Sequence, residues 1–204
     1  MRSVLASWSL DVNAGLKISL VARCTVNSRE AALTAALHPG GLLMSFQLTS
    51  KDLKDGQRMP EAQVFNGMGY SGGNRSPHLA WEGAPSGTQS FVVTCYDPDA
   101  PTGSGWWHWV VINIPASTKE LPADAGSGKG LPAGALQTRV DFGKPGYGGA
   151  APPPGPVHHY IFTVHALKVP RLDLDEQVSP AMIGYMVHMN SLGKASLTVT
   201  YGKQ

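Results

Sequence analysis

Two apolar segments separated by a short loop constrain the fold of this chain more than any other feature. Residues 90–96 read SFVVTCY and residues 106–114 read WWHWVVINI. Runs of this length, rich in β-branched and aromatic side chains, are typical of buried strands. Pro98 and Pro101 lie in the loop between them, and proline disfavours the interior of a sheet. The pattern therefore predicts a hairpin of two central strands.

Other segments extend the β prediction. Residues 195–201 alternate strictly between apolar and hydroxyl-bearing side chains, residues 160–167 are mostly apolar, and a shorter alternation begins at Met44. Glycine and proline contribute 24 and 16 of the 204 residues, about a fifth of the chain against a usual share of about 12%. Many turns and little long helix follow from this composition, so we predict a mostly β fold.

One helix is predicted near the C-terminus. Ser179 can serve as its N-cap, Pro180 as its first residue, and Gly193 is placed to end it. Apolar side chains recur between these signals at helical spacing. We interpret them as the face that packs on the core: Met182, Tyr185, Met186 and Met189.

The chain changes character near residue 44. Residues 1–43 show weak and mixed periodicity, and clear strand patterning begins only after them. We predict an N-terminal extension over 1–43 that is poorly ordered, followed by one domain over 44–204.

Composition disfavours several classes of partner and location. No run of lysine or arginine exists, so we expect no nucleic-acid partner. No apolar stretch reaches the roughly 18 residues of a membrane-spanning helix. Asp11, Asn13 and Lys17 interrupt any secretion signal, so we expect a cytoplasmic protein. Cys24 and Cys95 are too few for a disulfide scaffold or a cysteine-based zinc site.

The predicted hairpin brings a carboxylate near a histidine. Asp97 ends the first strand and His108 lies near the start of the second, so both approach the same rim of the sheet. Strand alternation places His108 on the face of Trp106 and Val110. Three tryptophans around one histidine indicate a pocket shielded from water. The structural alternative is that Asp97 caps a turn and His108 is an ordinary core histidine.

A second cluster follows a rigid loop, residues 152–156, which read PPPGP. Alternation places His158 and Tyr160 on one face of the next strand and His159 on the other. Imidazole, phenol and loop N–H groups are the donors that an anion pocket needs. A carboxylate beside an imidazole orients the ring and favours its charged form.

These clusters belong to a longer series of motifs. Together they resemble the phosphatidylethanolamine-binding protein family, and in particular its bacterial Raf-kinase-inhibitor-like branch. The likeness runs from about Met44 to Tyr201. It rests on Asn74-x-Ser76-Pro77-x-Leu79-x-Trp81, Asp97-Pro98-Asp99-Ala100-Pro101, Trp106-x-His108, Asp141-Phe142-Gly143, Gly146-Tyr147-x-Gly149 and Gly155-x-x-His158-x-Tyr160.

The resemblance implies a Greek-key β-sandwich of two antiparallel sheets with a few short helices. It also implies one small pocket for phosphate-like anions, with no catalytic residue, metal or cofactor. Family members regulate kinases, inhibit proteases or bind phospholipid headgroups, and bacterial members are often dimers. Some carry a cis proline at the position of Pro101, and we expect one here. The pocket would include Asp97, Pro101, Trp106, His108, Gly155, His158 and Tyr160.

One position departs from the family pattern. The family usually has His-Arg-Tyr where this chain has His158-His159-Tyr160. An arginine there can pair with the acids of the Asp-Pro-Asp loop, whereas a histidine is shorter. The support of the pocket is therefore expected to differ.

Three functions remain open from the sequence. The first is an anion-binding protein that regulates a partner. The second is a small hydrolase or lyase that uses Asp97, His108 and His158 as acid–base groups. The third is a metal site made from the same residues, although their spacing matches no standard zinc motif.

Overall fold

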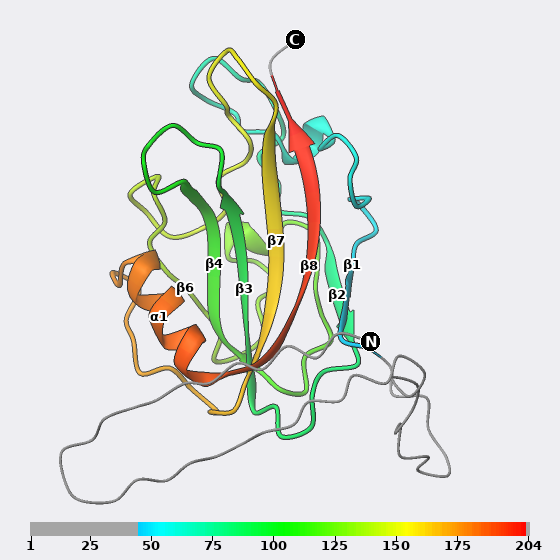
Figure 1. Ribbon diagram of the computed structural model, residues 1–204, viewed down its shortest axis with the longest axis vertical. Helices are drawn as coiled ribbons and strands as arrows, with labels where there is room; N and C mark the ends of the chain where they lie inside the picture. The colour runs from blue at the N-terminus through cyan, green and yellow to red at the C-terminus, as the bar shows by residue number, and fades with distance from the viewer. Residues whose placement is uncertain (1–44, 203–204) are drawn as a thin grey trace, which may run out of the picture. The chain divides into compact units, whose positions relative to one another are not determined.

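Two antiparallel sheets form the part of the chain that the computed structural model describes, residues 45–202 (Figure 1). The three-stranded sheet has the order β1–β2–β5, with β1 (Gln47–Thr49), β2 (Leu79–Glu82) and β5 (Glu120–Leu121). The five-stranded sheet has the order β6–β4–β3–β7–β8, with β3 (Ser90–Asp97), β4 (Trp106–Pro115), β6 (Leu136–Gln137), β7 (His158–Leu167) and β8 (Ser191–Tyr201). The predicted fold class is confirmed. The predicted extension over 1–43 lies outside the described residues and stays a prediction.

The strand order is that of a Greek key. β3, β4 and β6 lie side by side in chain order, and β7 then returns to pair with the free edge of β3. β3 and β4 form the predicted hairpin, with pairs from Ser90 opposite Pro115 to Asp97 opposite Trp106. This connection brings the end of β3 and the starts of β4 and β7 to one rim of the sheet.

The main core lies between the two sheets. Leu48 and Trp81 from the smaller sheet and Phe91 and Phe162 from the larger one are buried in a single apolar cluster. Burial of a large apolar side chain contributes about 1.5–3 kcal/mol. Close packing on the inner face of β3, β4 and β7 therefore fixes the rim where these strands meet.

A second apolar cluster covers the opposite face of the larger sheet. Helix α1 (Pro180–Asn190) packs there through Ile183 and Val187 against residues that include Leu167 and Leu172. The Ser179 side chain accepts a hydrogen bond from the Met182 backbone N–H, so the predicted helix start is confirmed.

The buried face of α1 differs from the prediction. Met182, Tyr185 and Met189 are 47%, 59% and 53% exposed, and only Met186 of the predicted stripe packs against the cluster. The segment is apolar on several sides, and the compact β-branched pair Ile183 and Val187 occupies the contact. The predicted helix end is also wrong, because α1 stops at Asn190 and Gly193 lies within β8.

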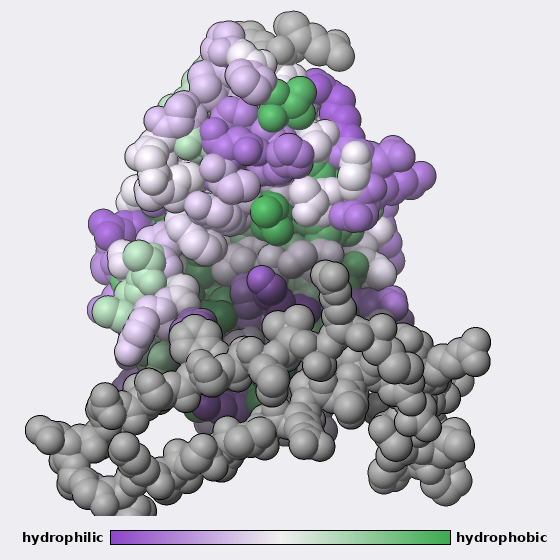
Figure 2. Space-filling model, in the orientation of Figure 1, coloured by the Kyte–Doolittle hydropathy of each residue, from purple (hydrophilic) through white to green (hydrophobic). Residues whose placement is uncertain are grey.

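The remaining helices are single 3-10 turns, η1 (Glu61–Gln63) and η2 (Ala125–Ser127). Within residues 45–202, no helix has the length and apolar character needed to cross a bilayer. The outward side chains of β8 include Ser196, Thr198 and Thr200. The same face of the molecule shows mostly hydrophilic and intermediate residues with isolated hydrophobic ones (Figure 2).

Candidate functional site

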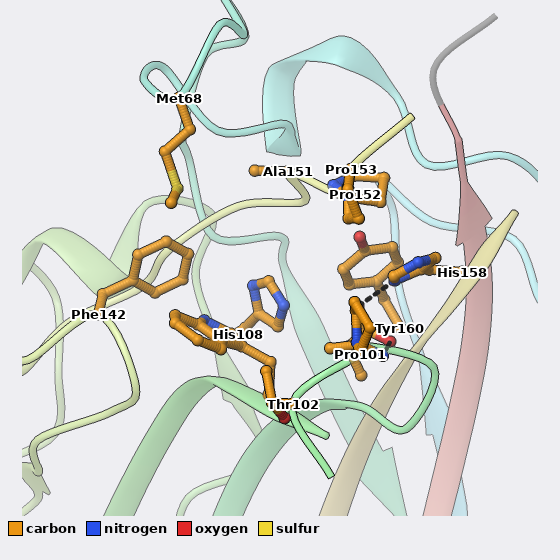
Figure 3. A pocket seen from close by; sticks show the side chains of 13 residues that line it. Met68, Pro101, Thr102, His108, Phe142, Ala151, Pro152, Pro153, His158 and Tyr160 are labelled. Atoms are coloured by element: carbon orange, nitrogen blue, oxygen red, sulfur yellow. Dashed lines mark hydrogen bonds and ion pairs between the residues drawn. The ribbon is translucent and has the colours of Figure 1, made fainter. Parts of the chain in front are cut away.

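A cavity opens at the rim where β3 ends and β4 and β7 begin (Figure 3). Its volume is about 170 Å³, several times the roughly 30 Å³ that one water occupies in the liquid, so a phosphoryl-sized group fits. None of the described residues that line it is a lysine or an arginine. The lining consists of Met68, Asp97, Ala100, Pro101, Thr102, Trp106, His108, Phe142, Ala151, Pro152, Pro153, His158 and Tyr160.

The structure brings six of the seven site residues from the sequence analysis to this cavity. These are Asp97, Pro101, Trp106, His108, His158 and Tyr160. Gly155 is exposed and does not line it. The rigid proline loop reaches the cavity through Pro152 and Pro153 instead, so the expected contribution of Gly155 to the pocket is not seen.

Asp97 holds His158 in place. The two side chains are buried, and Nδ1 of His158 lies 2.8 Å from Oδ2 of Asp97. The other carboxylate oxygen accepts hydrogen bonds from the backbone N–H groups of Asp99 and Ala100. Both oxygens of Asp97 are thus occupied, and the Nδ1 contact fixes the orientation of the imidazole.

His108 has a different role in the wall. Its Nδ1 lies 2.8 Å from the Gly148 carbonyl oxygen, which can only accept, so this nitrogen carries the proton. Burial lowers the pKa of His108, although nearby backbone carbonyls and the charge of Asp97 act in the opposite direction. The ring lies between Phe142 and Tyr160, with centroids 5.5 and 5.1 Å away (Figure 3).

Two donors in the wall have no hydrogen-bond partner within the described residues. They are the Tyr160 hydroxyl and the Trp106 indole N–H, both buried. Burial, after it the charge of Asp97, and least of all a weak hydrogen-bond interaction with that carboxylate raise the pKa of Tyr160, so its hydroxyl keeps the proton that it can donate. Buried polar groups in native proteins are usually paired, and an unpaired one calls for an explanation such as a bound ligand.

The strand alternation that placed His108 is interrupted by a bulge. β3 and β4 pair with a register shift between Cys95 and Tyr96, where β4 carries an extra residue. His108 therefore lines the cavity with Trp106 as predicted, but Val110 packs into the cluster beneath α1 on the other face. The predicted shared face of His108 and Val110 is wrong for this reason.

The Asp-Pro-Asp loop shows one correction and one close parallel to the family pattern. The described residues contain no cis peptide bond, so the expected cis bond before Pro101 is wrong. His159, the position at which different support of the pocket is expected from the sequence, reaches Asp99. Its backbone N–H and its Nδ1 lie 2.8 and 2.7 Å from Oδ2 of Asp99.

Several lining residues were not among the predicted site residues. Phe142 belongs to a motif of the resemblance but was given no place in the pocket. Met68 lies in a glycine-rich segment with no strand or helix signal. Its backbone is left-handed with φ of 56°, and its side chain points toward Phe142 at the mouth of the cavity (Figure 3). Nothing in the local sequence marks Met68 as a pocket residue.

Residues 45–202 contain no cluster of side chains that could form a metal site. Within residues 45–202, no three histidine, cysteine, aspartate or glutamate side chains are arranged to hold an ion. Cys95 lies beneath the site as a buried free thiol, and burial raises its pKa well above the usual value.

Similarity to known proteins extends over the residues that form the two sheets and the cavity. The sequence model of the phosphatidylethanolamine-binding protein family matches residues 49–202. The UPF0098 protein YbhB of Escherichia coli is 63% identical over 156 residues, which cover 76% of this chain and 99% of that protein. The UPF0098 protein YbcL of the same organism is 52% identical over 160 residues, which cover 77% and 87%.

Solved structures agree with this similarity. The crystal structure of Escherichia coli YbcL, described as a new member of the mammalian family, has a TM-score of 0.77 at 51% identity and covers 79% of this chain and 100% of its own. A homologue from Chlamydia trachomatis has a TM-score of 0.66 at 27% identity and covers 78% and 99%. The family model's match includes every residue that lines the cavity and all of both sheets except the first two residues of β1.

Proposed function

The chain belongs to the phosphatidylethanolamine-binding protein family, and from this premise we propose that its cavity binds a small phosphoryl-type anion, such as phosphate or a phospholipid headgroup. Its size supports the proposal, because a volume of about 170 Å³ has room for a phosphoryl group. No metal or cofactor is required for this binding.

The observation that carries the proposal is a cavity wall that combines the buried Asp97–His158 pair with two buried donors, Tyr160 and Trp106, that make no hydrogen bond of good geometry among the described residues. An oxyanion accepts hydrogen bonds and offers what these donors lack. His158 adds an imidazole whose orientation is fixed by Asp97. Asp97 repels an anion less than a free carboxylate would, because both of its oxygens already accept hydrogen bonds from the protein.

Binding is favoured over the enzyme alternative by the state of the hydroxyl groups. Thr102 and Tyr160 are the hydroxyl-bearing residues of the lining. Thr102 already donates to the Gly105 carbonyl. The raised pKa of Tyr160 makes its phenol a donor and a poor nucleophile at neutral pH. We therefore propose that Asp97, His108 and His158 serve ligand binding, because a covalent mechanism through a lining hydroxyl is disfavoured.

Regulation of a partner protein, a kinase or a protease, is the second part of the proposal. It rests on family membership. Occupancy of the cavity would alter the surface formed by the loop after β3 and the proline loop before β7, because both loops supply its walls. A partner that contacts these loops would then distinguish the empty from the filled protein.

Isothermal titration calorimetry with inorganic phosphate and with phosphoethanolamine tests the binding. A hydrogen bond to a charged group contributes about 1.5–3 kcal/mol, so His158→Ala should weaken binding by roughly ten- to a hundredfold. His159→Ala is the matched control, because the adjacent side chain is 53% exposed and does not line the cavity. Equal affinities of both variants, with circular dichroism spectra like that of the wild type, would contradict the proposal.

A further inference from the structure

The cavity has a polar side and an apolar side. His158 and Tyr160 carry polar groups on one side, and the side chains of Met68 and Phe142 lie on the other (Figure 3). A phosphoryl group bound at His158 and Tyr160 therefore leaves Met68 and Phe142 to contact the group attached to it. We call these two side chains the apolar side of the cavity.

Phe142 is a fixed part of this side. Its ring centroid lies 4.8 Å from that of Phe65 and 5.5 Å from the indole of Trp106. The ring also lies against Gly148, where a Cβ atom would collide with it. The position of Phe142 is thus set by packing within the protein, so its surface toward the cavity is present before a ligand binds.

Met68 has an unusual backbone for its residue type. Four described residues other than glycine have φ in the left-handed region: Met68, Asn74, Asn113 and Asp124. Asparagine and aspartate adopt this region more readily than other side chains, and methionine does so rarely. Glycine occupies both neighbouring positions, 67 and 69, and would adopt the conformation of Met68 without steric cost.

Burial does not explain a methionine at this position. The side chain is 72% exposed, so it contributes little to the core, yet it points toward Phe142 at the mouth of the cavity (Figure 3). Unfavourable backbone conformations are concentrated at ligand-binding segments, where a side chain is needed at one place. Methionine is unbranched and polarizable, and it adapts to apolar groups of different shape.

We infer that Met68 and Phe142 form a subsite for an apolar substituent on the phosphoryl ligand, and that Met68 determines specificity there. The ligand class is a phosphate ester with a hydrocarbon group, alkyl or aryl, next to the phosphoryl group. Monoesters and diesters both fit, because the contact depends on the apolar surface of the substituent. This inference rests on the proposed anion binding and names the group attached to the anion.

A series of alkyl phosphates tests the subsite in the wild-type full chain. Methyl, ethyl and propyl phosphate have nearly the same charge at a fixed pH and differ in hydrocarbon. Each buried methylene contributes about fourfold in affinity, so calorimetry should show propyl phosphate binding more than about tenfold more tightly than methyl phosphate. 2-Hydroxyethyl phosphate matches propyl phosphate in non-hydrogen atoms and should lose most of this gain, because its hydroxyl meets an apolar wall.

Two further probes extend the series to diesters and to aromatic groups. Methyl propyl phosphate should bind more tightly than dimethyl phosphate by a similar ratio, because the same substituent is added. Phenyl phosphate should also exceed methyl phosphate by at least about tenfold. Tighter binding of phenyl than of propyl phosphate would support an aryl source of the ligand, and the reverse order would support an alkyl source.

Substitution of Met68 assigns the preference to this side chain. Met68→Gln keeps the length but makes the side chain polar, so the preference for propyl over methyl phosphate should largely disappear while methyl phosphate binds as before. Met68→Leu should retain the preference. Met182→Gln is the matched control, because Met182 is 47% exposed on α1 and does not line the cavity.

The outcomes separate this inference from the proposed function. Equal affinities of the wild type for methyl and propyl phosphate, or an unchanged preference in Met68→Gln, would overturn the inference and leave anion binding intact. Absence of binding by every ester, by inorganic phosphate and by phosphoethanolamine would overturn the proposed function and this inference with it.

Discussion

Replacing Tyr160 with phenylalanine should stabilise the fold and weaken phosphate binding at the same time. The side chain is 1% exposed, and its hydroxyl makes no hydrogen bond of good geometry among the described residues, with only a weak interaction with the Asp97 carboxylate. Burying an unpaired polar group costs about 1–3 kcal/mol. Tyr160→Phe removes that cost and keeps the ring against His108, so we expect a gain of about 1 kcal/mol in the free energy of unfolding.

Tyr147 provides a matched control in the same core. It is also buried, but its hydroxyl donates to the Gln63 carbonyl oxygen at 2.8 Å. Tyr147→Phe makes the same chemical change and leaves an acceptor unpaired, so we expect a loss of about 1 kcal/mol. In a domain of this size, 1 kcal/mol moves the Tm by about 2–4 °C. The two variants should therefore melt on opposite sides of the wild type.

Thermal denaturation and calorimetry with phosphate, on the same preparations, measure the two effects. Binding to Tyr160→Phe should be roughly ten- to a hundredfold weaker, because one donor to the anion is lost. Binding to Tyr147→Phe should be unchanged. A Tyr160→Phe variant that melts as low as Tyr147→Phe would refute the argument that its hydroxyl is unpaired, and unchanged affinity would refute its role as a donor.

Three further predictions concern other parts of the chain. Burial lowers the pKa of His165 from 6.5 to about 4. Between pH 6.5 and 4 the unfolded chain therefore binds more protons than the folded one, so stability should fall as pH drops through this range. His165→Gln should flatten the fall in Tm measured by calorimetric scans. A chain lacking residues 1–43 should melt within a few degrees of the full chain, and a large drop would show that the segment belongs to the core. On α1, Ile183→Ala should cost about 2–5 kcal/mol in urea denaturation, whereas Met182→Ala should stay within about 0.5 kcal/mol, and equal losses would contradict the observed face of the helix.

Strand composition was the part of the fold most accessible to sequence reasoning. The runs that became β3 and β4 are apolar on both faces, and burial beneath one sheet and one helix explains that composition. The alternation that became β8 also matches its burial, with Ala195 and Val199 inside. Such patterns are local consequences of which face meets the core, so the sequence contains them directly.

The features that sequence reasoning missed depend on contacts between distant segments. The extra residue in β4 changes the face of Val110 because of how β4 pairs with β3, and no local pattern near His108 announces it. The α1 segment presents more than one apolar stripe, and only packing against Leu172 and its neighbours selects Ile183. Met68 lines the cavity although its segment is far in sequence from the other lining residues.

The contact between His159 and Asp99 anchors the outer side of the loop after β3. The loop after β3 is held by two carboxylates, Asp97 inside and Asp99 outside. The outer pair includes a backbone N–H of His159, which any residue at this position would supply, so part of the contact is independent of the side chain. The imidazole adds a bond that lowers the pKa of Asp99, but both side chains are more than a third exposed, where such pairs contribute at most about 1 kcal/mol. The buried pair of Asp97 and His158 therefore sets the position of the loop at the cavity, and the exposed pair of Asp99 and His159 adds a weaker second contact between the loop and β7.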